Sequence, residues 1–91
     1  MLPIKWRATA RDNLAAIVRY IAQDNVAAAR RMRELIEKAI EPAAKHPRMF
    51  RRGRVEGTHE IIAHPNYIIV YRVTDTAVEV LRVLHARQEY P

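Results

Sequence analysis

Four residues near the end of the sequence have side chains that could act on a phosphate group. Arg82, His85, Arg87 and Tyr90 all fall in the segment VLRVLHARQEYP. Histidine exchanges a proton near neutral pH, arginine neutralises phosphate charge, and tyrosine stacks on a base. The set is typical of a general acid–base site on a nucleic acid. A solvated chain end would carry the same residue types, and composition alone favours that plainer interpretation for His85.

A second group of charged residues lies in the middle of the chain. Residues 45–58 read KHPRMFRRGRVEGT, in which a proline and two glycines predict a loop. Five basic residues precede the first acid of this stretch, namely Lys45, Arg48, Arg51, Arg52 and Arg54. They predict either a contact with an acidic partner or a solvated loop that keeps the protein soluble.

The whole chain shares this basic character. Its 91 residues include 16 Lys and Arg against 10 Asp and Glu, which gives a net charge of +6. Nearly all of the basic residues are arginine, whose planar fork suits phosphate and carboxylate. The charge predicts a partner that is a nucleic acid, an acidic protein, or both. Without cysteine or a long apolar run, the sequence predicts a cytoplasmic protein with no disulfide and no membrane segment.

The segment HEIIAH, residues 59–64, is similar to the HExxH zinc signature but has different spacing. Its two histidines are one position too far apart to share a helix face, and the β-branched residues before Pro65 predict a strand. On a strand this odd separation would place His59 and His64 on opposite faces. His46 and His85 add no ligand spacing. We therefore expect neither a metal nor a cofactor.

Hydrophobic periodicity predicts the elements that carry these residues. PIKWR, residues 3–7, alternates as a strand does. Thr9 to Asp12 matches a helix-start signal, and apolar residues spaced three and four apart continue that helix. Asp24 or Asn25 is then available to cap a second helix, and Pro42 predicts that this helix ends or kinks near Glu41.

Three β-branched runs follow, separated by the short turns PN and TDTA, and predict an antiparallel meander at 59–64, 67–73 and 78–84. The resulting β-α-α-β-β-β order predicts one α+β domain over residues 1–91, with its helices on one face of a small sheet. A period of two places Val80, Arg82 and Leu84 on one face. Pairing of the last two strands would then bring Arg72 near Arg82, with Glu60 or Glu79 as the balancing anion.

Three motifs in this order resemble the RelE/ParE superfamily of bacterial toxins from type II toxin–antitoxin systems. They are ARDNLAAIVRYIA, GxxEIIAHxxYIIVYRV and VLRVLHARQEYP, and together they extend the resemblance from Trp6 to Tyr90. The resemblance implies a helical hairpin on an antiparallel sheet, which agrees with the predicted order. It also implies a hetero-oligomer with a cognate antitoxin, whose acidic, disordered segment would fold onto this basic chain.

The superfamily contains two functions, and the resemblance leaves both open. RelE-like members cut mRNA on the ribosome without a metal, and ParE-like members poison DNA gyrase. A typical RelE-like strand reads Gly-Asp-Tyr-Arg, but alignment on Tyr67 places Ile68 at the arginine position. An apolar side chain cannot stabilise phosphate charge, so the resemblance favours the ParE-like branch. A third hypothesis is a toxin relic, retained only as half of an autoregulatory DNA-binding complex.

Each function implies roles for the exposed surface that we expect the last strand and tail to form. For a gyrase poison, the target-binding residues would be Arg72, Arg82, His85, Arg87 and Tyr90. For a ribonuclease, His85 would be the general acid or base and Tyr90 would orient the substrate or stack on a base. Arg82 or Arg87 would then stabilise the phosphate.

Overall fold

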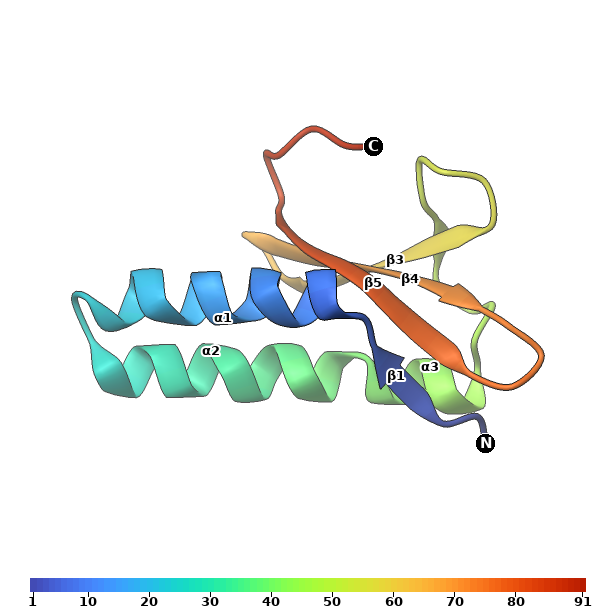
Figure 1. Ribbon diagram of the computed structural model, residues 1–91, viewed down its shortest axis with the longest axis horizontal. Coiled ribbons are helices and arrows are strands. Elements are labelled where there is room, and N and C mark those ends of the chain that lie inside the picture. The colour runs from blue at the N-terminus through green and yellow to red at the C-terminus, as the bar shows by residue number, and fades with distance from the viewer.

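The computed structural model describes residues 1–91. They fold into a helical layer and a five-stranded sheet (Figure 1). The predicted α+β class is confirmed, and so is the predicted order of the main elements. The short strand β2 and the short helix α3 are additional to that prediction. In chain order the elements are β1 (Ile4–Trp6), α1 (Ala8–Ala22), α2 (Val26–Ala39), α3 (Glu41–Lys45), β2 (Arg51–Arg52), β3 (Thr58–His64), β4 (Tyr67–Val73) and β5 (Val78–His85).

The starts of the two long helices have different causes. Helix α1 begins directly after β1, because the Arg7 N–H still donates to the Val80 carbonyl of the sheet at 3.0 Å. Thr9 therefore lies inside the helix, and the predicted Thr9 cap is wrong, since no side chain caps α1. Asn25 does cap α2, its Oδ1 accepting a hydrogen bond from the Ala28 N–H at 2.9 Å. This confirms one of the two caps predicted there.

The predicted break near Glu41 is confirmed. Helix α2 ends at Ala39, and α3 starts at Glu41 with Pro42 in its first turn. Proline fits a first helical turn because the N–H that it lacks would have no partner there. As a result, the helical segment is divided between Ala39 and Glu41 instead of continuing as one longer helix. None of the helices has both the length and the apolar character needed to cross a bilayer.

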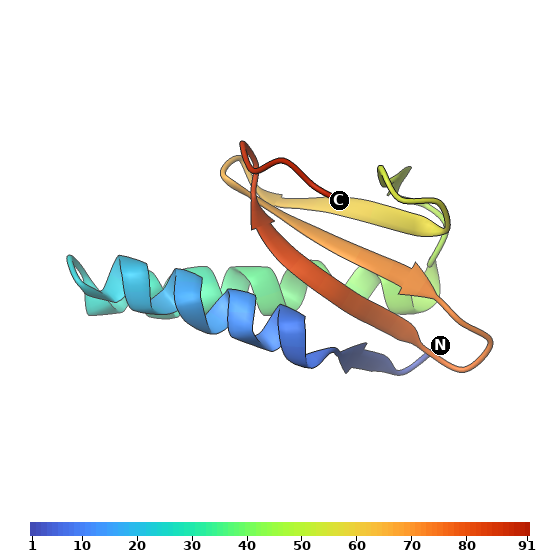
Figure 2. The same cartoon turned by 45° about the horizontal axis from the view of Figure 1, so that its top comes forward.

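The strands are arranged in the order β1-β5-β4-β3-β2. The predicted meander of β3, β4 and β5 is confirmed as antiparallel. Strand β1 pairs parallel to β5, with Ile4 opposite Val78, so segments from opposite ends of the sequence lie side by side. The helical hairpin covers one face of this sheet, and the C-terminal tail turns back over the other face, here called the outer face (Figures 1 and 2).

Alternating side chains of β4 supply both faces of the sheet. Tyr67, Ile69 and Tyr71 point to the helices and belong to the main core. Ile68 and Val70 point to the outer face and form a smaller cluster with two residues that follow them in the chain, Leu84 and Tyr90. Because both faces are covered, β4 reads as a nearly continuous apolar run, as the sequence YIIVYRV shows.

A register shift in β5 changes which side chains share a face. Val70 lies opposite Arg82, but the next residue, Tyr71, lies opposite Val80, so β5 has an extra residue at this point. Val80 therefore belongs to the helix-side core, while Arg82 is on the outer face with Leu84. The prediction that all three share a face is wrong, because a bulge inverts the alternation beyond it.

Candidate functional site

The C-terminal tail packs across the outer face of the sheet. It leaves β5 with a hydrogen bond from the Ala86 N–H to the Asn66 carbonyl at 2.7 Å. It ends with Tyr90, which is only 6% exposed and clusters with Ile68, Val70 and Leu84. The expectation of an exposed Tyr90 is therefore wrong, because the outer face of the sheet is apolar at its centre and the tyrosine ring covers it.

The tail and the basic loop meet at Tyr90. The Arg54 N–H donates to the Tyr90 hydroxyl at 3.3 Å, and the Arg54 guanidinium donates to the Tyr90 carbonyl at 3.3 Å. The same guanidinium lies 5.2 Å from the centroid of the Tyr90 ring. Two segments that the sequence presents as separate are thus one connected surface.

The loop between β2 and β3 is ordered by close backbone contacts. The Gly53 N–H donates to the Thr58 carbonyl at 2.9 Å, and the Thr58 hydroxyl donates to the Val55 carbonyl at 2.6 Å. A Cβ at Gly53 would lie 2.2 Å from the Thr58 Oγ1, so this position has room only for glycine. Gly57 has a φ of +83°, which favours glycine for its backbone conformation rather than for space.

His85 lies opposite Tyr67, on the side of the sheet that meets α1, whereas Tyr90 packs on the outer face. Arg87 follows His85 and is exposed. His85 is exposed, its Nδ1 accepts a hydrogen bond from the Arg87 N–H at 3.1 Å, and its ring lies edge-on to Tyr67 at 5.6 Å. It borders a shallow hollow of about 280 Å³ beside α1, into which Tyr20 also faces. The structure therefore separates the predicted general acid or base from the predicted substrate-orienting tyrosine.

The two strand arginines have different surroundings. Arg72 forms an ion pair with Glu79 at 2.7 Å, and this hydrogen bond is the main reason why the pKa of Glu79 is lowered. One of the two predicted balancing anions is thus confirmed for Arg72. Arg82 has a buried Nε atom with no hydrogen-bond partner and borders a hollow of about 460 Å³ together with Arg7. No sequence pattern indicates that Arg7 lies beside Arg82, because only the β1–β5 pairing brings these two residues together.

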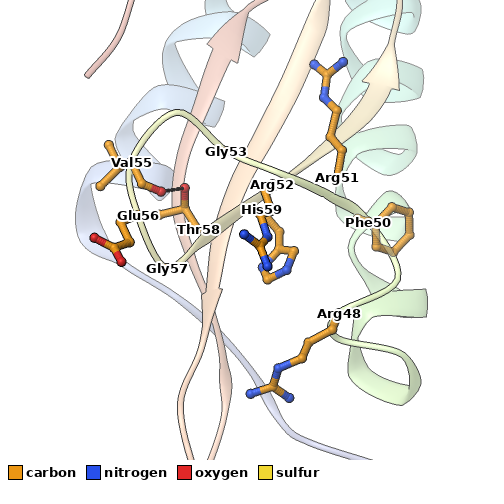
Figure 3. Close-up of a pocket in the computed structure, with 10 residues that line it drawn as sticks. All are labelled: Arg48, Phe50, Arg51, Arg52, Gly53, Val55, Glu56, Gly57, Thr58 and His59. Atoms are coloured by element: carbon orange, nitrogen blue, oxygen red, sulfur yellow. Dashed lines mark hydrogen bonds between the residues drawn. The ribbon is translucent and has the colours of Figure 1, made fainter.

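The larger hollow, here called the β2 hollow, has a volume of about 650 Å³ and lies between the basic loop and β3 (Figure 3). Arg51, on its border, forms an ion pair with the buried Glu60 at 2.9 Å. Arg48 and Arg52 also border the hollow and form no ion pair. Lys45 is exposed at the end of α3, beyond the residues that line the hollow.

An aromatic group supports the floor of the β2 hollow. The His59 ring stacks on Tyr71 with a centroid distance of 5.3 Å, and Phe50 lies edge-on to Tyr71 at 6.4 Å. The Tyr71 hydroxyl donates to the Pro47 carbonyl at 2.5 Å, and burial raises the pKa of Tyr71 to about 12. The spacing of HEIIAH raised His59 only as a possible metal ligand, and no pattern in the sequence indicated its place beside the basic loop.

The expected placement of the HEIIAH histidines is also wrong. A register shift between Ile62 and His64 places His64 opposite Tyr67, while His59 lies opposite Tyr71. Tyr67 and Tyr71 share the helix side of β4, so the two histidines are on the same side of the sheet. Each is engaged locally: His64 Nδ1 accepts from the Asn66 N–H at 3.0 Å, and His59 stacks on Tyr71.

The comparisons with known proteins agree with this fold and extend it to a family. The family model described as the ParE toxin of the type II toxin–antitoxin system parDE matches residues 4–90. The chain belongs to the ParE toxin family. Toxin Y4kP of Sinorhizobium fredii is 38% identical to this ParE-family chain over 89 residues, which cover 97% of this chain and 92% of that protein. Toxin RelE2 of Caulobacter vibrioides is 37% identical over 83 residues and 89% of each chain.

Solved structures give this ParE-family toxin the same architecture. A chain of the chromosomal ParDE toxin–antitoxin system from P. aeruginosa superposes with a TM-score of 0.82 at 20% identity, covering 93% of this chain and 96% of that one. A chain of the RelBE2 toxin–antitoxin complex from Mycobacterium tuberculosis gives a TM-score of 0.60 at 28% identity, covering 92% and 96%. The RelE/ParE resemblance of the three sequence motifs is confirmed, and the protein is a toxin of the type II class.

Proposed function

We propose that this toxin poisons DNA gyrase and traps the enzyme's complex with cleaved DNA. The match to the ParE family over residues 4–90 supports this target. The outer face of the sheet supports it as well, because Ile68 occupies the position of the arginine in the RelE-like strand and is 7% exposed. Its neighbours there are the apolar side chains of Val70, Leu84 and Tyr90. This apolar centre is the observation that carries the proposal, because a phosphate in a transition state needs charge at that place.

The positions of the other candidates are consistent with binding rather than chemistry. His85 lies beside α1, Arg82 lies beside Arg7, and Tyr90 is held by Arg54 on the outer face. An acid–base reaction needs its groups within hydrogen-bond reach of one substrate. Groups spread in this way suit a broad contact with a large target such as gyrase, in which Arg87 and His85 form one exposed part.

A supercoiling assay tests this function. Purified gyrase, relaxed plasmid and ATP are incubated with and without the toxin, and DNA products are separated after protease treatment. The proposal expects blocked supercoiling together with accumulation of protein-linked cleaved DNA. Normal supercoiling at a large excess of toxin would reject gyrase as the target. Expression without an antitoxin is the companion test, because unaffected growth would favour the relic hypothesis.

The second candidate is ribosome-dependent cleavage of mRNA, which two relatives support by name. Toxin RelE2 is 37% identical to this chain, and the RelBE2 chain is 28% identical. If gyrase is untouched, translating ribosomes are the next target to test, with primer extension to map cuts. Loss of cutting in both His85→Ala and Tyr90→Phe would support this candidate. Loss in neither would remove the ribonuclease roles assigned to these residues.

We also propose a complex with a cognate antitoxin. The similar solved chains come from ParDE and RelBE2 toxin–antitoxin systems, which supports a partner of this class. The net charge of +6 favours an acidic segment in that partner. Co-expression with the neighbouring open reading frame, followed by purification on a tag carried by one chain, should recover both. Recovery of the toxin alone at physiological salt would count against that pairing.

A further inference from the structure

The β2 hollow is not used by the contacts proposed above for the outer face. It opens at the β2 edge of the sheet, where the loop of residues 53–57 arches over β3 (Figure 3). Its volume of about 650 Å³ falls within the range of small-ligand sites. The pinned contacts of Gly53 and Thr58 keep this loop in place, so the hollow is formed before any ligand arrives.

Uncompensated positive charge borders this hollow. Arg48 and Arg52 are exposed and form no ion pair, whereas Arg51 is already neutralised by Glu60. One acid, Glu56, also borders the hollow, but its carboxylate points away from Arg48 and Arg52 (Figure 3). Two arginine forks are thus available to an anion bound in the hollow, and each can donate two parallel hydrogen bonds to it.

His59 can add a further donor between these arginines and the core. It lies directly opposite Arg52 across the β2–β3 pair and opposite Tyr71 on the other side. Its Nδ1 is buried without a hydrogen-bond partner. With Nδ1 buried, Nε2 is the ring nitrogen that can serve as a hydrogen-bond donor to a ligand. Since His59 lines the hollow, its ring is within the space that the arginines border and can contribute to anion binding there.

We propose that the β2 hollow binds a phosphate of a nucleic-acid backbone, with Arg48, Arg52 and His59 as its donors. Phosphate matches the planar guanidinium fork. The lining is mostly polar, with Phe50 and Val55 as its two apolar residues, so it offers few pockets for the side chains of an amphipathic peptide. Backbone phosphates of DNA and RNA share this chemistry, and the exposed cations around the hollow would add sequence-independent attraction.

This inference deepens the proposed function, because a gyrase poison works beside cleaved DNA. Only the biological role of the hollow rests on the proposed gyrase poisoning; its binding of nucleic acid does not. Nucleic-acid binding is measured on the isolated toxin, and gyrase poisoning is measured on the enzyme. Binding without poisoning would leave the inference intact and reject gyrase, and poisoning without binding would do the reverse.

The experiment is fluorescence anisotropy of the full chain with a short labelled duplex DNA, one of its single strands, and RNA of the same sequence, each at several salt concentrations. The test variant is Arg48→Ala with Arg52→Ala. The matched control is Arg30→Ala with Arg31→Ala, which removes the same charge from the exposed side of α2, away from the hollow. Thermal melts of all variants establish that they are folded.

The test variant should weaken binding at least about tenfold at low salt and reduce the slope of log K against log salt by about 1, as expected for the loss of one neutralised phosphate. The control should change the affinity by less than about threefold. Equal losses of affinity in both variants would show that the effect comes from net charge alone, and would reject the proposed binding site. Unchanged nucleic-acid binding in the test variant would also reject the site. This holds even if the variant binds an antitoxin less tightly. The probe with the highest affinity identifies which of duplex DNA, single-stranded DNA and RNA the hollow prefers.

His59 provides a second test that separates binding from support of the core. His59→Phe keeps a ring to stack on Tyr71 but removes the donor, and His59→Gln keeps an amide donor but removes the ring. The inference expects weaker binding in His59→Phe than in His59→Gln, while the melting temperatures follow the opposite order. Equal affinity in the two variants would remove His59 from the site.

Discussion

The Arg54 guanidinium lies 5.2 Å from the centroid of the Tyr90 ring, and the Arg54 N–H donates to the hydroxyl of the same tyrosine. One residue belongs to the basic loop and the other to the C-terminal tail. Their contact makes these two segments a single surface above the outer face of the sheet. Substitutions in the tail should therefore also change the stability of the loop.

Tyr90 is expected to stabilise the fold mainly through its ring. Tyr90→Ala uncovers Ile68 and Leu84 and should lower the free energy of unfolding by about 2–4 kcal/mol. Tyr90→Phe removes only the hydroxyl that accepts from the Arg54 N–H and should cost about 0.5–1.5 kcal/mol. Urea denaturation followed by circular dichroism measures both. The control is Tyr20→Ala on α1, because Tyr20 is 71% exposed; a cost as large as that of Tyr90→Ala would contradict the prediction.

Gly53→Ala should destabilise the loop through one identifiable clash. The new Cβ would lie 2.2 Å from the Thr58 Oγ1, and we expect a cost of about 1–3 kcal/mol. In a Thr58→Ala background the same change should cost less, because the clashing oxygen is gone. A double-mutant cycle measures this coupling, expected to be at least about 0.5 kcal/mol. Gly57→Ala is the control, since its cost comes from a φ of +83° and should not depend on Thr58.

Acidification should weaken the Arg72–Glu79 pair. The pKa of Glu79 is lowered in the folded state, first by its hydrogen bond from Arg72, so the pair stabilises the fold above the ordinary carboxyl pKa of 4.5. This contribution is lost as the pH falls through the lower folded pKa. Glu79→Gln should therefore lose less stability than the wild type between about pH 5 and pH 3. Urea midpoints across this range are the measurement, and a loss of stability in Glu79→Gln equal to that of the wild type would contradict the prediction.

Alkaline conditions should lower the stability of the fold through Tyr71. Burial raises its pKa from 10.0 to about 12, so the protonated ring favours the folded state. Its contribution is complete below the unfolded pKa and is lost as the pH rises through the folded one. Tyr71→Phe should make stability less dependent on pH above about 10, at the cost of the hydrogen bond to Pro47. Melting temperatures measured upward from neutral pH test this, and an equally flattened profile in Tyr20→Phe would contradict it.

Local patterns in the sequence were sufficient for the elements but not for their relations. Apolar spacing and the Asn25 cap depend on neighbouring residues, and the meander follows from short turns, so these predictions held. The β1–β5 pairing depends on residues far apart in the chain, and no periodic signal marks it. Thr9 failed as a cap for this reason, because the sheet holds Arg7 and starts the helix earlier.

The candidate site was less predictable because single extra residues decide it. The bulge in β5 moves Arg82 to the outer face, and counting by twos cannot detect it. The loop and the tail were each identified as charged or reactive, but their contact between Arg54 and Tyr90 is not encoded in either segment alone. The only sequence signal for this contact was Tyr90 after a polar stretch. Such a tyrosine can pack on the protein's own sheet as readily as it can contact a partner.

The parallel pairing of β1 with β5 also has a consequence for the time at which the toxin becomes a finished molecule. Strand β5 lies inside the sheet, between β1 and β4, and supplies Val78, Val80 and Val83 to the core. A chain still being translated lacks this strand until residues 78–85 have been made, so its first strand has no neighbour and its helices lack part of the surface on which they pack. The sheet of the nascent toxin therefore cannot close, and its core cannot be completed, until residue 85 has been made.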